Sequence, residues 1–341
     1  MSDTFGLDIG TTSIKALSLK KGGNSFAIES MGLGPAPQKG IMSESPEDLH
    51  KFAEAVKQII TSANIKQKEV NVALPESQVY TKIIEMPALS EKELAAALKY
   101  EMEQYIPLPL DQVKTDWQVL SPSTAQNKTS RILLVAASLA LIKKYETVLD
   151  ELGLVPSTIE TEMLSVHRSI FPLVNTASSN MIVHMGAATT NIAVVENGEL
   201  IMVFTVDKGG IAITRAISLD LGIDLTQADS YKKAYGLNKD AFEGKIGKSL
   251  FPILESILGD IRKTMLLYKE KNPNQTITQM ILSGGSAQLP GVDIYFTNQL
   301  NIQVVLGSSF QVYDMKNVPP EIGADSLSYN VVSGLALKDA I

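Results

Sequence analysis

The sequence predicts an α/β protein of two lobes, with a small α/β subdomain inserted into the first lobe. An apolar strand, a turn of glycine and hydroxyl residues and a second strand occupy residues 5–19, and the same succession returns at 181–195. Alternating apolar residues beside such turns are typical of hairpin strands. A third apolar run, at 277–282, leads into the pair Gly284 and Gly285. One glycine-containing hairpin in each half of the chain therefore indicates two related lobes.

The composition suits a globular protein with a large core. The chain has 341 residues, of which 45% are hydrophobic and 20% charged, as in ordinary globular proteins. A formal net charge of −7 argues against a large nucleic-acid interface, which needs clustered positive charge, so we expect no nucleic-acid partner. The absence of cysteine excludes disulfides, thiolate metal sites and cysteine nucleophiles.

No segment of the sequence predicts insertion into a membrane. Residues 1–4 carry no basic region followed by an apolar run, so no secretory signal is expected. The most apolar stretch, 132–142, is far shorter than the ~20 residues of a spanning helix. We therefore expect a soluble, cytoplasmic protein without direct membrane insertion, which would reach a membrane only through a partner.

The first lobe, predicted at residues 1–75, continues from its hairpin into a helix. Ser45 is expected to cap this helix with its hydroxyl, and Pro46 takes the first helical position. Apolar residues at helical spacing follow and predict one buried stripe. A buried strand at 70–74 closes this part of the chain.

A change of pattern near Glu76 marks the inserted subdomain, predicted at residues 76–155. A strand at 79–86 is followed by Ser90 and Glu93, whose spacing is that of a capping box at a helix start. We expect two strand-and-helix passes, the second made of strands near 116–120 and 132–137 and a helix at 139–152. The remaining boundaries place a return to the first lobe at 156–180, the second lobe at 181–320 and a C-terminal helix returning to the first lobe at 321–341.

The two turns carry the residue types that a phosphate site needs. Glycine lets the backbone approach a phosphate, and successive turn N–H groups form an anion-binding concavity. Hydroxyl groups can donate to phosphate oxygens, Lys15 can neutralise charge, and Asp8 can hold Mg²⁺ through water, since this ion retains several waters. Either turn alone is weak evidence, because most such hairpins are ordinary turns; a similar pair, with a third glycine-rich strand end, is much stronger.

These three elements resemble the phosphate-1, phosphate-2 and adenosine motifs of the superfamily of actin, sugar kinases and heat-shock chaperones. The resemblance implies an actin-like (ribonuclease H-like) fold that holds ATP and Mg²⁺ between its lobes. It implies that one side of the nucleotide site consists of Asp8, Gly10, Thr11, Thr12, Ser13 and Lys15, and the other of Gly186, Thr189, Thr190, Asn191, Gly209, Gly210, Asp229, Lys232, Gly284 and Gly285.

Simpler interpretations exist for some of these residues. The pair Gly209–Gly210 is also typical of a helix N-terminus. Asp229 and Lys232 lie at helical spacing and could form a solvated surface pair. Asn191 could serve only to stabilise its hairpin.

One departure from the superfamily pattern concerns hydrolysis. His184 stands where the second lobe usually has a metal-linked aspartate that mirrors Asp8. A neutral imidazole lacks the negative charge that Mg²⁺ prefers. The sequence therefore predicts nucleotide binding with at most slow ATPase activity, and it identifies no catalytic residue.

The inserted segment resembles the PilM family of type IV pilus assembly proteins. The matching residues are Pro75-Glu76-Ser77, Met86-Pro87-Ala88-Leu89-Ser90, Glu93-Leu94 and Glu101-Met102-Glu103-Gln104-Tyr105-Ile106-Pro107. The resemblance implies an ATP-binding scaffold of a type IV pilus, or of a related secretion or DNA-uptake machine, recruited to the inner face of the cytoplasmic membrane. Its implied partners are the N-terminal tail of a PilN-like membrane protein and other inner-membrane components of the pilus. The tail would dock between the first lobe and the inserted subdomain, in the region of residues 79–86 and 91–105.

Two other functions fit the same fold. A small-molecule kinase would need a general base near the γ-phosphate, for which Asp207 is the one weak candidate, and it could instead cap the following loop. A filament-forming protein resembling FtsA would share the inserted subdomain, but such proteins typically carry an amphipathic C-terminal tail. Here the sequence stops at Lys338–Ile341, directly after the last predicted helix.

Overall fold

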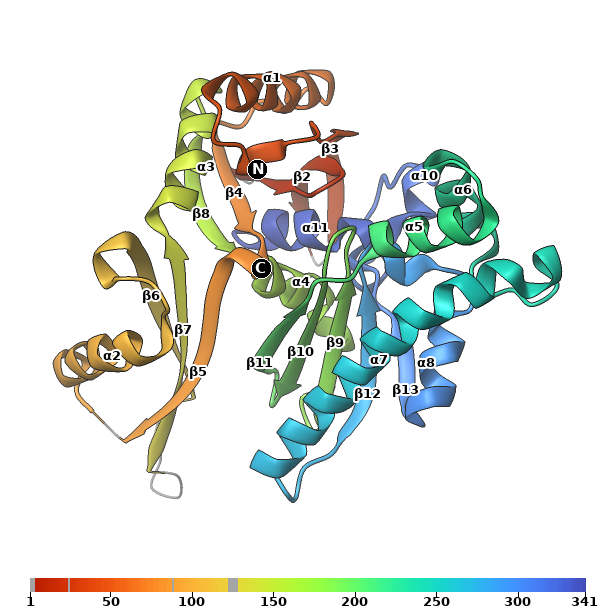
Figure 1. Ribbon diagram of the computed structural model, residues 1–341. Coiled ribbons are helices and arrows are strands. Elements are labelled where there is room, and N and C mark those ends of the chain that lie inside the picture. Colours follow the sequence, from red (N-terminus) through yellow and green to blue (C-terminus); the bar gives the residue numbers. More distant parts are fainter. Residues whose placement is uncertain (1–3, 24, 88, 122–127) are drawn as a thin grey trace.

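Two five-stranded sheets with the same strand order form the body of the molecule (Figure 1). The structure, a computed structural model, describes residues 4–23, 25–87, 89–121 and 128–341; Met1–Asp3, and Ala88 of the motif quoted above, lie outside this part. The first sheet has the order β3-β2-β1-β4-β8, with β1 (Thr4–Ile9), β2 (Ser13–Gly22), β3 (Ser25–Pro35), β4 (Glu69–Leu74) and β8 (Val155–Thr161). The second has the order β11-β10-β9-β12-β13, with β9 (Ser179–Met185), β10 (Thr190–Glu196), β11 (Glu199–Val206), β12 (Ile277–Ser283) and β13 (Gln303–Leu306).

The two sheets also share their strand directions. In each, three consecutive strands pair antiparallel and two later strands pair parallel beside the first. The predicted hairpins at 5–19 and 181–195 are β1–β2 and β9–β10, at equivalent places in the two sheets. The predicted α/β class with two related lobes is confirmed.

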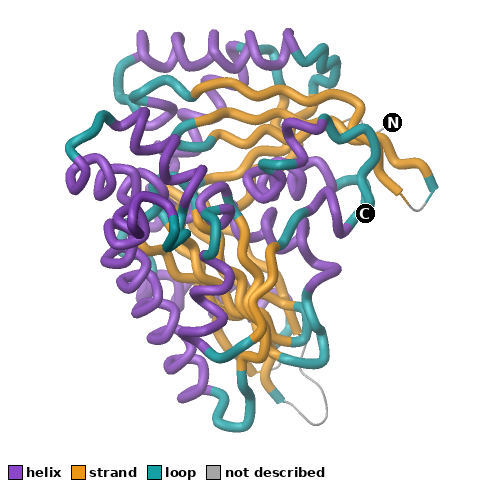
Figure 2. The backbone as a smooth tube through the Cα atoms, turned by 90° about the vertical axis from the view of Figure 1, so that its right-hand side faces the viewer, coloured by secondary structure: helices purple, strands orange, loops and turns teal. Residues whose placement is uncertain are grey.

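Helices cover the sheets in layers, which Figure 2 shows from the side. On the first sheet, α1 (Pro46–Ser62) buries Phe52, Val56 and Ile59. Pro46 occupies its first turn as predicted, but the expected hydroxyl cap from Ser45 is wrong, because Ser45 makes no side-chain capping bond. Asp48 in the first turn accepts instead from the hydroxyl of Ser43, at 2.7 Å.

The inserted subdomain is a three-stranded antiparallel sheet with one helix. Its strand order is β5-β7-β6, built from β5 (Val79–Pro87), β6 (Val113–Ser121) and β7 (Thr129–Ser138), and α2 (Glu91–Tyr105) packs on it through Leu94, Leu98 and Met102. The predicted capping box is present, since the hydroxyl of Ser90 accepts from the Glu93 amide and the Glu93 carboxylate accepts from the Ser90 amide.

The second helix expected in this subdomain belongs elsewhere. In α3 (Leu139–Glu151), the buried side chains of Leu141, Tyr145 and Val148 pack into the core of the first lobe, together with Phe5 and Phe52. The inserted sheet ends at β7, so the predicted limit at residue 155 includes a helix of the first lobe.

A shared core joins the two lobes at the centre of the molecule. It contains α4 (Glu162–Ile170) and α11 (Asn330–Leu337), which lie between the two sheets in Figure 1. Gly334 allows their close contact, because a β-carbon on it would lie 1.9 Å from the carbonyl oxygen of Ser165. The helix α11 also packs against β1 and β2 of the first sheet.

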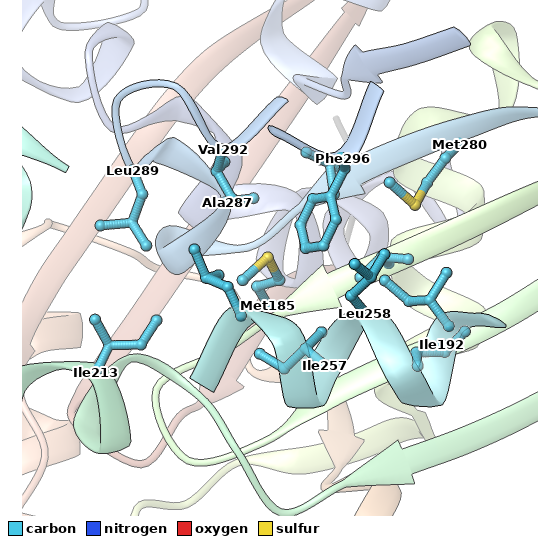
Figure 3. Packing of buried hydrophobic residues seen from close by; sticks show 14 of the residues in the cluster. Met185, Ile192, Ile213, Ile257, Leu258, Met280, Ala287, Leu289, Val292 and Phe296 are labelled. Atoms are coloured by element: carbon cyan, nitrogen blue, oxygen red, sulfur yellow. The ribbon is translucent and has the colours of Figure 1, made fainter. Parts of the chain in front are cut away.

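Four helices contribute to the core around the second sheet: α5 (Gly210–Leu221), α6 (Leu225–Tyr235), α7 (Lys245–Lys271) and α8 (Val292–Leu300). By contrast, α9 (Ser309–Val312) and α10 (Pro320–Gly323) contribute Phe310 and Ile322 to a cluster with β2 and β3 of the first sheet. The core of the second lobe holds the strands on both sides of the second hairpin turn. Met185 before the turn and Ile192 after it pack with Ile257, Leu258 and Phe296 (Figure 3). No helix in the described part of the chain is long and apolar enough to cross a bilayer.

Candidate nucleotide site

The two hairpin turns have the same backbone geometry. The amide of Gly10 donates to the carbonyl of Ser13 at 3.1 Å, and the amide of Gly186 donates to the carbonyl of Thr189 at 2.9 Å. A β-carbon on Gly10 would lie 2.9 Å from its partner oxygen, and one on Gly186 would lie 3.1 Å away. Only glycine fits such close contacts without a local shift. The similarity of the two turns in sequence therefore corresponds to one repeated structure.

In the first lobe, a buried ion pair lies beside the turn. Asp8 and Lys15 face each other across β1 and β2, with Nζ 3.8 Å from Oδ2, and Lys15 also donates to Ser13 Oγ at 3.0 Å. Burial raises the pKa of Asp8, and the nearby Lys15 charge opposes this effect. Thr11 and Thr12 are exposed at the tip of the turn. The arrangement offers a cation and two hydroxyl groups to an anion next to one carboxylate.

This part of the site suits Mg²⁺ held chiefly by phosphate and water. Within the described residues, no group of three or more histidine, aspartate or glutamate side chains could hold a metal by itself. Mg²⁺ commonly takes only one or two carboxylates from the protein, together with phosphate oxygens and waters. Asp8 can supply one such carboxylate, so Mg²⁺ at this position stays a prediction.

In the second lobe, His184 is a buried and neutral residue. Its Nδ1 lies 3.0 Å from Ser283 Oγ, and that hydroxyl oxygen accepts from the Asn330 amide at 2.7 Å. Burial, together with the positive charge of Lys15, lowers the pKa of His184 to about 4. The hydrogen-bonded, uncharged histidine therefore brings no negative charge to the site.

Close backbone packing joins α5 to the second turn. The amide of Gly210 donates to the carbonyl of Gly186 at 3.0 Å. A β-carbon on Gly209 would lie 2.7 Å from that same oxygen, and one on Gly210 would lie 2.5 Å from Ser286 Oγ. Gly284 has φ +89°, and a β-carbon there would lie 2.4 Å from Met185 O. Gly209, Gly210 and Gly284 thus gather around the turn at Gly186, whereas a β-carbon on Gly285 would lie nearest to Ser328, at 3.5 Å.

Lys232 reaches the same place from α6. Its Nζ is buried and donates to Thr214 Oγ1 at 2.8 Å and to the carbonyl of Gly210 at 3.3 Å. It also pairs with Asp229 at 2.5 Å. Burial opposes ionisation of Asp229, but hydrogen bonds from Lys232 and Lys233 lower its pKa to about 2. Lys232 is therefore part of the interior beneath α5 and not a solvated surface residue.

Two predicted residues have protein partners. Thr190 is buried, and its hydroxyl donates to the carbonyl of Lys208 at 2.7 Å. The Asn191 side chain accepts from Thr205 Oγ1 at 2.9 Å and donates to Glu162 Oε2 at 3.2 Å. The bond to Thr205 joins β10 to β11 and not the two strands of the hairpin at 181–195. Direct contact of either residue with nucleotide stays a prediction. The kinase candidate Asp207 is exposed directly after β11.

Three polar side chains packed between α3, α4 and the first lobe were not predicted from the sequence: Glu162, Glu76 and Tyr145. Glu162 begins α4, and burial raises its pKa to about 8, helped by the negative charges of Asp8 and Glu76. The pKa of Glu76 is also raised by burial. In the described part of the chain, the buried Tyr145 hydroxyl has no hydrogen-bond partner. Burial raises its pKa, and the negative charges of Glu162 and Asp8 add to this effect. No local pattern marks these residues, because their proximity arises only when α3 and α4 pack on the first lobe.

We expect Glu162→Gln to stabilise the protein at alkaline pH. The carboxyl of Glu162 has an ordinary pKa of 4.5 and a folded pKa of about 8, so its contribution is fully present below pH 4.5 and is lost as the pH rises through 8. The neutral amide removes this loss, so the variant should exceed the wild type by a few kcal/mol, in order of magnitude, at pH 9 and by little at pH 5. Urea unfolding at both pH values measures the difference, with exposed Glu54→Gln as control. Parallel pH profiles for wild type and Glu162→Gln would contradict the burial argument.

Comparison with known proteins gives one family match over nearly the whole chain. The model of the family described as Type IV pilus assembly protein PilM matches residues 6–340. Cell division protein FtsA of Streptococcus pneumoniae is 22% identical over 350 residues, covering 87% of this chain and 76% of the relative. FtsA of Enterococcus faecalis is 23% identical over 328 residues, covering 84% and 74%.

Similarity to solved structures identifies the fold of the chain. A structure titled PilM-PilN type IV pilus biogenesis complex superposes with a TM-score of 0.85 at 21% identity, covering 99% of both chains. MreB5 of Spiroplasma citri bound to AMPPNP gives a TM-score of 0.52 at 14% identity, covering 99% of this chain and 96% of that chain. At these identities the likeness concerns the fold alone. The predicted actin-like fold is confirmed.

Proposed function

This chain belongs to the family of type IV pilus assembly proteins PilM, and from that premise we propose that it is an ATP-binding scaffold that docks the N-terminal tail of a PilN-like membrane protein. The observation that carries the nucleotide part is the repeated turn: one structure occurs at Gly10 and at Gly186, one per lobe. The buried Lys15, whose charge acts on His184 of the other lobe, supports a site that spans both lobes. We further propose that the protein works in the cytoplasm and reaches the membrane through its partner.

In this proposal the nucleotide holds the two lobes together. The turn residues and Lys15 bind the phosphates from the first lobe, and the turn at Gly186 binds them from the second. The glycines around Gly284 and the buried Lys232 form the adenosine side. ATP with Mg²⁺ supplies a multiply charged group that both lobes contact, and this favours the closed arrangement by a population shift. The neutral His184 supports slow or no turnover.

The docking part of the proposal rests on a groove beside the inserted subdomain. It has a volume of about 340 Å³ and lies between β5, the end of α2 and β11 of the second lobe. Its second wall thus belongs to the second lobe, whereas the resemblance implies docking between the first lobe and the inserted subdomain. Tyr80, Tyr105 and Phe204 line it and stay 37%, 42% and 38% exposed. Lys82 Nζ lies 4.5 Å above the Tyr105 ring.

An extended tail suits this groove for two reasons. Both β5 and β11 are edge strands of their sheets, and an edge strand can pair with an added peptide through its backbone. Exposed aromatic side chains at the centre of a groove are the usual anchors of protein contacts. The likeness to a structure titled PilM-PilN complex supports a PilN-like partner as the occupant.

We expect Tyr105→Ala to weaken tail binding about 30-fold, since removing an aromatic anchor commonly costs about 2 kcal/mol. Calorimetric titration with a synthetic peptide of the N-terminal tail of the PilN-like protein from the same organism measures the effect. Tyr100→Ala is the matched control, because Tyr100 lies on the same helix, is 67% exposed and does not line the groove. Equal peptide affinity for the two variants would exclude this groove as the docking site.

A further inference from the structure

Hydrogen bonds connect one wall of the groove to α4. Glu76 lines the groove, is buried, and accepts from the Thr81 hydroxyl of the groove at 3.0 Å and from the Met163 amide of α4 at 3.2 Å. The Glu76 amide in turn donates to Oε2 of Glu162 at 3.4 Å. The wall of the groove nearest the inserted subdomain is therefore bonded to the first turn of α4.

The opposite wall of the groove is also connected to Oε2 of Glu162 by hydrogen bonds. Thr205 of β11 lines the groove, and its hydroxyl donates to Asn191 Oδ1 at 2.9 Å. The Asn191 amide donates to Oε2 of Glu162 at 3.2 Å. Hydrogen bonds from both walls of the groove thus converge on one carboxyl oxygen, which belongs to the helix between the two sheets.

Glu162 is also linked to the nucleotide site, through the hydrogen bond that it accepts from Asn191 of β10. The side chain is partly buried; burial raises its pKa, and the negative charges of Asp8 and Glu76 add to this effect. Asp8 is the penultimate residue of β1, before the first phosphate turn, and is paired with Lys15. Asn191 is the second residue of β10, just after the second turn. The groups that connect the groove walls therefore include a residue next to the second turn, and the charge of Asp8, next to the first turn, acts on Glu162.

We propose that Glu162 couples the groove to the nucleotide cleft, so that ATP·Mg and the partner's tail bind cooperatively. This inference rests on the proposed function for the identity of the two ligands. A tail seated in the groove fixes the separation of its walls, and a nucleotide fixes the separation of the two turns. Glu162 and Asn191 take part both in the bonds between the groove walls and in the structure next to the turns. The ligand that binds first therefore orders these two side chains, and the second ligand binds to a site that is already ordered. The coupling is reciprocal by thermodynamic linkage.

The test is the ratio of tail-peptide dissociation constants without and with saturating ATP·Mg, measured by calorimetry. We expect a ratio of at least about 5 for the wild type, the lower end of common allosteric couplings. Thr205→Val removes only the hydroxyl bond to Asn191, and Glu162→Ala removes the shared acceptor; both should bring the ratio towards 1. Glu162→Gln keeps an acceptor oxygen and should retain the coupling.

Thr278→Val is the matched control, since its hydroxyl bond to Ser178 lies at an exposed site away from the groove. If both ligands bind the wild type with a ratio of 1, the coupling is excluded while the proposed function stands. An unchanged ratio in both Thr205→Val and Glu162→Ala excludes this route. If ATP·Mg or the peptide fails to bind the wild type, the proposed function fails first and the coupling with it.

Discussion

Replacing Lys15 with alanine is expected to lower the affinity for ATP·Mg by 10- to 100-fold. Lys15 is the buried cation beside the first phosphate turn, where it lies 3.8 Å from Asp8 and 3.0 Å from Ser13 Oγ. A hydrogen bond to a charged group contributes about 1.5–3 kcal/mol, which corresponds to a change of this size. The variant also leaves the carboxylate of Asp8 unpaired next to the phosphates, and this acts in the same direction.

Calorimetric titration of Lys15→Ala measures the loss, with Lys20→Ala as the matched control. Lys20 lies further along β2, away from the turn, and its side chain is exposed. Unfolding of both variants without nucleotide separates a binding effect from a loss of the fold. Equal affinity of Lys15→Ala and the wild type would remove the first lobe's turn from the nucleotide site.

The second large effect is expected on stability, at the contact between the lobes. In Gly334→Ala, the new β-carbon would lie 1.9 Å from the carbonyl oxygen of Ser165, so α4 and α11 must move apart. Overpacking of a rigid core commonly costs about 1–3 kcal/mol and sometimes more, and this contact is with backbone that cannot rotate away. We therefore expect a loss at or above about 3 kcal/mol in the free energy of unfolding.

Urea unfolding of Gly334→Ala checks this value. Gly259→Ala is the control: Gly259 lies within α7, and a β-carbon there meets no atom within 4 Å. Alanine in an exposed helix is favoured over glycine by about 0.5–1 kcal/mol, so the control should gain stability. A loss below about 1 kcal/mol in Gly334→Ala would show that the two helices adjust freely, contrary to the rigid junction described above.

The parts of the fold that depend on neighbouring residues could be predicted from the sequence. The hairpins around Gly10 and Gly186 are local, and the capping box of Ser90 and Glu93 needs only a spacing of three residues. The cap at Ser45 was predicted on the same grounds and is wrong, since the Ser45 side chain makes no capping bond. The Ser45 amide donates to the Ser43 hydroxyl oxygen at 3.2 Å, and that hydroxyl donates to Asp48.

Features that depend on packing between distant segments could not be predicted. The apolar stripe of α3 shows that one face is buried, but not that Tyr145 and Val148 pack on the first lobe instead of the inserted sheet. Glu162 looks like an ordinary charged residue at a helix start, and its burial follows from the contacts of Glu76 and Asn191 with it. The groove could not be predicted from the sequence for the same reason, since its two walls come from strands more than a hundred residues apart.

The central claim is that one nucleotide is held by both lobes, and calorimetric titration of the wild type with ATP·Mg tests it most directly when paired with one variant in each lobe. Lys15→Ala changes the first lobe and Lys232→Ala the second. We expect one ATP per chain and a clear loss of affinity in either variant. No binding by the wild type, or binding that survives both substitutions unchanged, would contradict a site between the lobes.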